Sequence, residues 1–321
     1  MTNTPLALVG DIGGTNARFA LVEPGSVTLN SVAVLPCADY DNLDGAVRDY
    51  LQQAGAGDVN RACMAFACPV NDETVRMTNN PWVFRKTAMR EALGLELFKI
   101  VNDFTAMALG VPHVTADQLH PVGGGVRDMH RPRLVIGPGT GLGVSALVPT
   151  HHDFVPLATE GGHVDFAPTD ELEVAVQQTL RARFGRVSVE RILSGQGLLN
   201  LYQALAEIEQ EPVRLHTPQA VTQAALQQHD PFARRVLRMF CEILGRVAGN
   251  AALTLGSLGG VYVCGGIVPR FLDFFRDSPF RVAFEEKGRM RPLMESIPTY
   301  VVTEPYTGLL GAAEALDNEE V

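Results

Sequence analysis

Lysine is scarce in this chain of 321 residues, in which only Lys86, Lys99 and Lys287 stand among 26 basic residues. None of the three follows a glycine, so the G-K-[ST] sequence of a P-loop is missing. The formal charge of −10 argues against nucleic acid as a partner, because its phosphates need a basic face. Phosphate ligands stay possible, since backbone N–H groups and a metal ion can bind them locally.

Paired cysteines and long apolar runs are also missing. The five cysteines are odd in number and form no C-x-x-C pair, which predicts free thiols in a reducing compartment. No apolar run approaches the roughly 18 residues that would span a membrane. The first residues lack the charged region of a signal peptide. We therefore expect a cytoplasmic protein with no membrane partner.

The chain contains one pattern twice. Residues 6–22 and 133–148 each form an apolar strand, a glycine-rich turn and a second strand. Further strand and helix patterns follow each copy, including a strand that runs directly into a helix over 98–110 and a long helix over 232–255. The repeat predicts an α/β fold with two lobes of duplicated architecture. We place the smaller lobe at 1–110, completed by a C-terminal helix at 307–321, and the larger at 111–306.

The two glycine turns are candidate phosphate sites, because glycine exposes backbone N–H groups and permits close approach. A single glycine hairpin is often only a hairpin, but two matched copies with threonine at the turn favour a phosphate clamp. A dinucleotide-binding turn would lead into a helix, whereas residues 17–22 alternate as a strand. The H-R-D loop of protein kinases is missing too, since Pro132 follows His130 and Arg131.

An ordered set of motifs resembles bacterial glucokinases of the group without the cysteine-rich zinc motif. These enzymes belong to the actin, Hsp70 and hexokinase superfamily, whose ribonuclease H-like fold the resemblance implies. The motifs cover nearly the whole chain: GDIGGTNAR (10–18), TNNPW (78–82), NDFTAMA (102–108), GPGTGLG (137–143), EGGHVDF (160–166), SVERILSG (188–195) and GGVYVCGGI (259–267).

The resemblance implies ATP and Mg²⁺ as cofactors, glucose as the second substrate and a homodimer. The implied nucleotide-binding residues are Gly10, Asp11, Ile12, Gly13, Gly14, Thr15, Asn16, Gly139, Thr140, Gly141, Gly265 and Gly266. Within this set, Asp11 would act on magnesium through water, although an Asx-turn role is the alternative. The implied glucose contacts are Asn79, Asn102, Asp103, Glu160, His163 and Glu190, with Asp103 also the catalytic base.

The chemistry of phosphoryl transfer suits these residues. A sugar hydroxyl needs a carboxylate to accept its proton, and Asp103 follows the strand pattern 99–101, where ligands gather in α/β sheets. The alternative is that Asn102 or Asp103 only caps the next helix. Glu160 and His163 can orient sugar hydroxyls, and the two glycines between them let the backbone approach the sugar. The related zinc-containing kinases carry a cysteine cluster downstream of this histidine. Residues Asp165 to Arg181 contain no cysteine, so the resemblance implies no zinc.

Two other functions compete with a glucokinase. A sugar-responsive repressor on the same fold would need a DNA-binding segment ahead of Gly10 and a more basic surface. A kinase for mannose, fructose or an N-acetylhexosamine would recognise a sugar that differs from glucose in a few ring substituents, and motif spacing does not resolve that difference.

Overall fold

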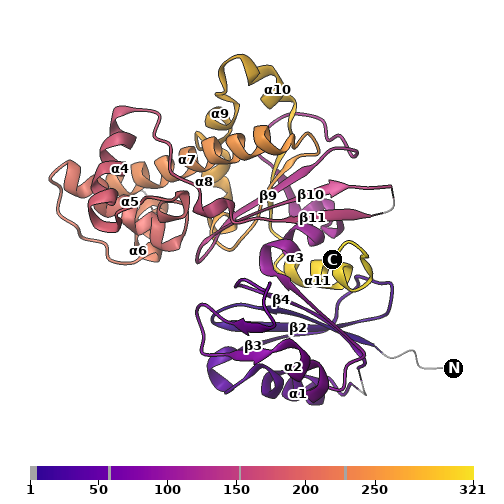
Figure 1. Cartoon of the computed structure of the whole chain (residues 1–321). Helices are drawn as coiled ribbons and strands as arrows, with labels where there is room; N and C mark the ends of the chain where they lie inside the picture. Colours follow the sequence, from indigo (N-terminus) through magenta and orange to yellow (C-terminus); the bar gives the residue numbers. More distant parts are fainter. Residues whose placement is uncertain (1–5, 57–58, 152, 228–229) are drawn as a thin grey trace. The chain divides into compact units, whose positions relative to one another are not determined.

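The computed structural model describes residues 6–56, 59–151, 153–227 and 230–321 (Figure 1). The chain divides into two compact units. Unit 1 consists of Met1–Ala116, Ala146–Ala158 and Glu304–Val321, and unit 2 of Asp117–Ser145 and Thr159–Thr303. The division expected from the sequence differs mainly at Ala146–Ala158, which the sequence pattern leaves with the larger part.

The first sheet has five strands in the order β3-β2-β1-β4-β7. Their bounds are β1 Ala7–Ile12, β2 Asn16–Val22, β3 Asn30–Pro36, β4 Arg61–Phe66 and β7 Leu97–Asn102. The first three strands pair antiparallel, whereas β1, β4 and β7 run parallel. The carboxyl ends of β1, β4 and β7 therefore meet at one edge of the sheet, where the predicted site residues of unit 1 follow the strands.

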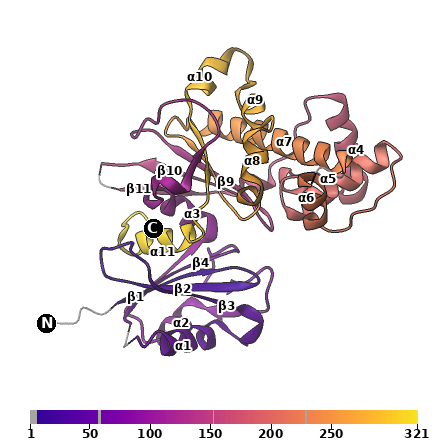
Figure 2. The same ribbon diagram turned by 180° about the vertical axis from the view of Figure 1, so that it is seen from behind.

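Helices cover both faces of this sheet. They are α1 Leu43–Gln53, α2 Lys86–Ala92, α3 Asp103–Gly110 and α11 Thr307–Asp317. Figures 1 and 2 show α1 and α2 on one face and α3 and α11 on the other. The strands β1 and β4 are almost wholly buried, as expected for parallel strands between two helical layers. A short hairpin, β5 Thr74–Arg76 with β6 Val83–Arg85, also belongs to unit 1.

The second sheet repeats the plan of the first. Its order is β11-β10-β9-β12-β13-β8, in which β9, β12 and β13 run parallel like β1, β4 and β7. The bounds are β8 Leu119–Pro121, β9 Arg133–Pro138, β10 Leu142–Pro149, β11 Phe154–Ala158, β12 Val261–Val263 and β13 Thr299–Val302. The strand order thus confirms the internal duplication that the two glycine turns predicted.

Unit 2 also contains most of the helices: α4 Glu171–Phe184, α5 Gly195–Ile208, α6 Pro218–Leu226, α7 Pro231–Leu255, α8 Leu272–Arg276, α9 Phe280–Glu285 and α10 Arg291–Ser296. The longest, α7, confirms the predicted helix. Asp230 caps its first turn by accepting from the N–H of Phe232 at 2.9 Å, and Gly256 ends it in the left-handed conformation. Its apolar stripe is buried in the core of unit 2.

Other local predictions are also confirmed. The strand-to-helix run over 98–110 forms β7 and α3. All five cysteines are free and buried. None of the helices in the described part of the chain has the length and apolar character needed to cross a bilayer.

Candidate active site

The first glycine bend joins β1 to β2. The Gly13 N–H donates to the Asn16 carbonyl at 2.9 Å and closes the bend. The carbonyls of Gly13 and Thr15 accept from the side chain of Asn80 and the N–H of Cys37, at 3.4 and 2.8 Å. Apart from the Gly13 N–H, the bonds described here hold the bend through its carbonyl groups, which suits a loop whose other N–H groups bind an anion.

The predicted glucose contact Asn79 packs directly on this bend. A Cβ atom added at Gly14 would lie 2.6 Å from the Cβ of Asn79, so only glycine fits at position 14. The structure thus brings Asn79 next to the first bend, and Asn79 is exposed there. Position 14 needs glycine because of this contact with Asn79, and the close approach of a bound phosphate would add a second reason.

Asp11 lies on β1, opposite Arg18 on β2. The Arg18 Nη1 donates to Asp11 Oδ2 at 3.0 Å. Burial raises the pKa of Asp11, and the neighbouring guanidinium opposes this shift. A Cβ atom at Gly308, in the first turn of α11, would lie 3.1 Å from the Asp11 carboxyl carbon. Asp11 is thus confined between β2 and α11, which does not fit the simple turn residue considered as the alternative.

Asn102 and Asp103 lie where β7 ends and α3 begins. Asn102 caps α3, since its Oδ1 accepts from the N–H of Phe104 at 2.9 Å and of Thr105 at 3.4 Å. The Oδ1 of Asp103 also accepts from the Phe104 N–H, at 2.9 Å. The capping alternative therefore holds for Asn102. Its Nδ2 donates to the Cys68 carbonyl at 3.5 Å, which leaves one hydrogen of this group for a sugar. For Asp103, capping and catalysis are compatible, because a carboxylate has two oxygens.

Helix α11 fixes the position of α3. A Cβ atom on Gly311 would lie 1.6 Å from the Ala106 carbonyl oxygen, and one on Gly110 would lie 2.0 Å from the Thr307 carbonyl oxygen. The two helices touch backbone to backbone, so the helix that begins with Asp103 cannot shift independently of α11. Gly110, where the sequence pattern ends the smaller lobe, also permits this helix contact.

The second glycine bend joins β9 to β10 in unit 2. The Gly139 N–H donates to the Gly141 carbonyl at 2.8 Å, and the Gly139 carbonyl accepts from the Gly195 N–H at 2.8 Å. Gly265 has a left-handed φ of 85°, and a Cβ atom there would lie 2.7 Å from the Pro138 carbonyl oxygen. The predicted adenosine loop therefore touches the second bend through a glycine that no other residue can replace without strain.

A cavity of about 700 Å³ opens beside this bend. Gly139 and Thr140 line it at one side, and Gly266 and Arg270 at another. Much of its remaining wall comes from α6, through Pro218, Gln219, Thr222, Gln223 and Leu226. The volume suits a ligand of nucleotide size. The α6 wall escaped the sequence prediction, because the segment has no motif and its apolar spacing is that of any amphipathic helix.

The three remaining glucose contacts gather around the start of β10. Glu160 precedes η4 Gly161–His163, a 3-10 helix of one turn. The His163 N–H donates to the Glu160 carbonyl at 3.0 Å. A Cβ atom at Gly162 would lie 2.0 Å from the Leu142 carbonyl oxygen, so this turn packs on β10. Glu190 reaches the same strand, with its Oε2 accepting from the Leu142 N–H at 2.9 Å. The side chains of Glu160 and His163 are 71% and 57% exposed, available to a ligand.

Comparison with known proteins identifies the family. A glucokinase family model matches residues 8–319. The chain is 64% identical to a glucokinase of Hahella chejuensis, across 100% of both chains. The chain belongs to the glucokinase family. It is accordingly an ATP-dependent hexose kinase, a transferase.

Solved structures agree with this family assignment. A glucokinase from an Antarctic psychrotroph superposes with a TM-score of 0.89 at 33% identity, over 98% of this chain and 99% of that chain. A glucokinase of the ROK family from Streptomyces griseus, solved with glucose and AMPPNP, has a TM-score of 0.66 at 21% identity, over 97% and 99%. The chain has the actin-like ATPase fold of these glucokinases.

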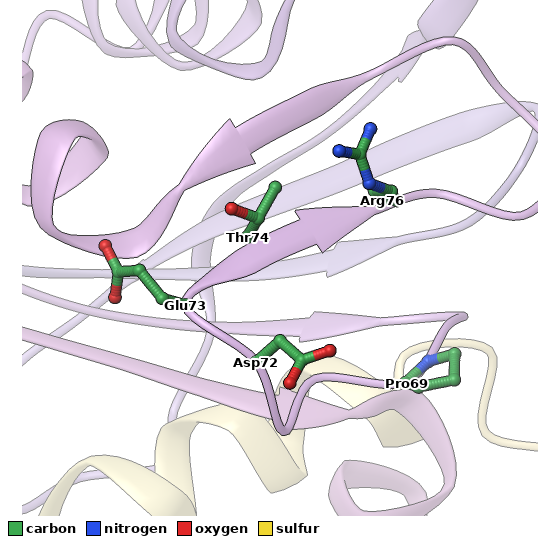
Figure 3. Close-up of a pocket in the computed structure, with 5 residues that line it drawn as sticks. All are labelled: Pro69, Asp72, Glu73, Thr74 and Arg76. Carbon is green, nitrogen blue, oxygen red and sulfur yellow. The ribbon is translucent and has the colours of Figure 1, made fainter.

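A further hollow of about 490 Å³ lies in unit 1 beside the β5–β6 hairpin (Figure 3). Pro69, Asp72, Glu73, Thr74 and Arg76 line it, and none of them is a predicted site residue. The Glu73 carboxylate already accepts from the hydroxyl and the N–H of Thr87, at 2.6 and 3.1 Å. Within the described ranges, no group of three or more His, Cys, Asp or Glu side chains could hold a metal ion.

Proposed function

We propose that this chain transfers the γ-phosphoryl group of ATP to the 6-hydroxyl of glucose, giving glucose 6-phosphate, with Asp103 as the general base. The proposed base and the first phosphate bend lie in unit 1. The second bend, the adenosine loop and the proposed glucose contacts Glu160, His163 and Glu190 lie in unit 2. The glucokinase of Streptomyces griseus, which has the same fold, was solved with glucose and AMPPNP, in keeping with these two ligands.

One observation supports the proposal more than any other. In the bend Gly139–Leu142, Gly139 and Thr140 line the cavity. In the same bend, the Leu142 N–H donates a hydrogen bond to the Glu190 carboxylate. A nucleotide site and a candidate sugar contact therefore share a bend of four residues. Phosphoryl transfer depends mainly on positioning and charge stabilisation, and a shared short loop provides that positioning.

Asp103 has the chemistry that the base requires. It is half-buried, it follows a strand at its carboxyl end, and its Oδ1 bond to the Phe104 N–H fixes the direction of the carboxylate. In that place it would accept the proton of the attacking sugar hydroxyl. Asn102, locked as the cap of α3, would present its Nδ2 to the same sugar.

The residues present also fit magnesium. The Asp11 carboxylate lies just before the first bend, with one oxygen bonded to Arg18. It would hold the ion through water. Magnesium, when bound with ATP, neutralises charge on the phosphate oxygens. We further propose that no zinc takes part, that the chain forms a homodimer, and that it works in the cytoplasm, where its five free thiols would stay reduced.

The variant Asp103→Asn tests the base, because asparagine keeps the oxygen that accepts from the Phe104 N–H. We expect kcat to fall about 10²-fold or more in a coupled assay while glucose still binds. The matched control is Asp230→Asn, which makes the same change at the cap of α7 and should leave kcat unaltered. Near-normal turnover by Asp103→Asn would refute the assignment. A panel of hexoses in the same assay tests the preference for glucose.

A further inference from the structure

The second bend is held at both ends by one short segment, residues 190–195. At one end the Glu190 Oε2 accepts from the Leu142 N–H at 2.9 Å. At the other end the Gly195 N–H donates to the Gly139 carbonyl at 2.8 Å. The bend between Gly139 and Leu142 therefore cannot change shape without breaking one of these bonds or moving the segment.

The carboxylate of Glu190 also lies against the glycine at position 141. A Cβ atom there would lie 2.4 Å from the Glu190 Oε2, closer than real Cβ atoms approach. Any other residue at position 141 would push the carboxylate away from the Leu142 N–H. This glycine thus serves the contact with Glu190, in addition to any close approach of a phosphate.

The segment that carries Glu190 is itself fixed. Glu190 lies in the 3-10 turn η5 Val189–Arg191, and its carbonyl accepts from the Ser194 hydroxyl at 2.9 Å. The same Ser194 oxygen accepts from the Gly197 N–H at 2.9 Å and caps α5. The Val189 N–H donates to the Val164 carbonyl at 2.9 Å, next to His163. The backbone that carries Glu190 is therefore fixed between the sugar-contact turn and the bend, whereas its side chain reaches the bend through the bond to the Leu142 N–H.

We propose that Glu190 is a positioning residue for ATP as well as a contact for glucose, and that it couples the binding of the two substrates. The inference rests on the proposed function, which makes Glu190 a sugar contact. A sugar hydroxyl bound to this carboxylate would restrict its rotation and so stabilise the bond from Oε2 to the Leu142 N–H. By linkage, glucose should then tighten nucleotide binding, and nucleotide should tighten glucose binding to the same degree.

The test measures AMPPNP binding with magnesium by calorimetry, in the absence of any sugar. A residue that only contacts sugar would not affect this Kd. Glu190→Ala removes the acceptor of the Leu142 N–H, so we expect the Kd to rise about tenfold, as for a lost bond to a charged group. Glu190→Gln keeps an acceptor oxygen without the charge and should give a smaller rise. Gly141→Ala, which displaces the carboxylate, should raise the Kd in the same direction.

Glu160→Ala is the matched control, because its carboxylate is exposed and belongs to the same proposed sugar site. It should weaken glucose binding without changing the AMPPNP Kd measured without sugar. In the unaltered chain glucose should lower that Kd, and in Glu190→Ala this effect should disappear. Far-UV circular dichroism and thermal unfolding establish that each variant is folded.

Three results would overturn the proposal: an AMPPNP Kd unchanged in the folded Glu190→Ala variant, a glucose effect that survives in it, or no AMPPNP binding by the unaltered chain. Failure of the proposed function looks different. Suppose that the unaltered chain binds AMPPNP, that Glu190→Ala binds it more weakly, and that the unaltered chain phosphorylates no hexose. The role of Glu190 at the bend then stands, and the assignment of the sugar substrate is wrong.

Discussion

The backbone contact between α3 and α11 predicts that a single methyl group, far along the chain from Asp103, lowers catalysis. In Gly311→Ala the new Cβ would lie 1.6 Å from the Ala106 carbonyl oxygen, whereas real Cβ atoms keep at least 3.0 Å from such atoms. The two helices must part by about 1.4 Å, the difference between these distances. Backbone cannot rotate away as a flexible side chain would, so α3 itself has to move.

This displacement has two expected costs. Overpacking a close contact destabilises a protein by about 1–3 kcal/mol. A misplacement of about 1 Å at a reacting group can lower the rate about 10²-fold. Because Asp103 is the first residue of α3, we expect kcat in Gly311→Ala to fall up to that extent, with a smaller change in the KM for glucose.

The assay combines kcat at saturating glucose and ATP with the free energy of unfolding in urea. Gly124→Ala is the matched control, because a Cβ atom there meets nothing within 4 Å. The control should match the unaltered chain in both measurements. A Gly311→Ala variant that is as stable and as active as the control would refute the reasoning, since it would mean that α11 does not fix α3.

Three further predictions concern single sites. Glu160→Gln should raise the KM for glucose by the equivalent of about 1.5–3 kcal/mol, since a hydroxyl loses its charged acceptor, and an unchanged KM would contradict this role. A zinc-selective chelator should leave activity unchanged with magnesium present; loss of activity that zinc restores would overturn the zinc-free site. Glu173 is almost fully buried and paired with Arg246. The variant Glu173→Ala should therefore lower the free energy of unfolding by about 3–5 kcal/mol, because it leaves a buried charge unpaired. The exposed Glu295→Ala should cost less than about 1 kcal/mol, and equal losses for both variants would show that burial of the pair is unimportant.

Local patterns in the sequence predicted the elements that carry the site. The run over 98–110 changes from strand to helix at Asn102 because Asn102 can cap the helix, and that signal lies within a few residues. The two bends were recognisable because glycine and threonine between alternating strands specify a turn locally. The duplicated sheet order followed from the repetition of this unit.

The resemblance to glucokinases also implied that Glu160, His163 and Glu190 contact one sugar, and the structure gathers the segments of these three residues at the start of β10. The bond from the Leu142 N–H to Glu190 and the packing of Gly162 on Leu142 were beyond sequence reasoning. A hydrogen bond across 48 residues leaves no periodicity in the sequence.

The sequence by itself determined the elements, the bends and the family, because turns, caps and amphipathic spacing depend on neighbours along the chain. Only the tertiary structure decided that α6 walls the cavity, that Gly141 faces Glu190 and that Gly311 touches Ala106. Each of these is a contact between segments distant in the chain. Close packing, rather than local conformational preference, selects the residue at such positions.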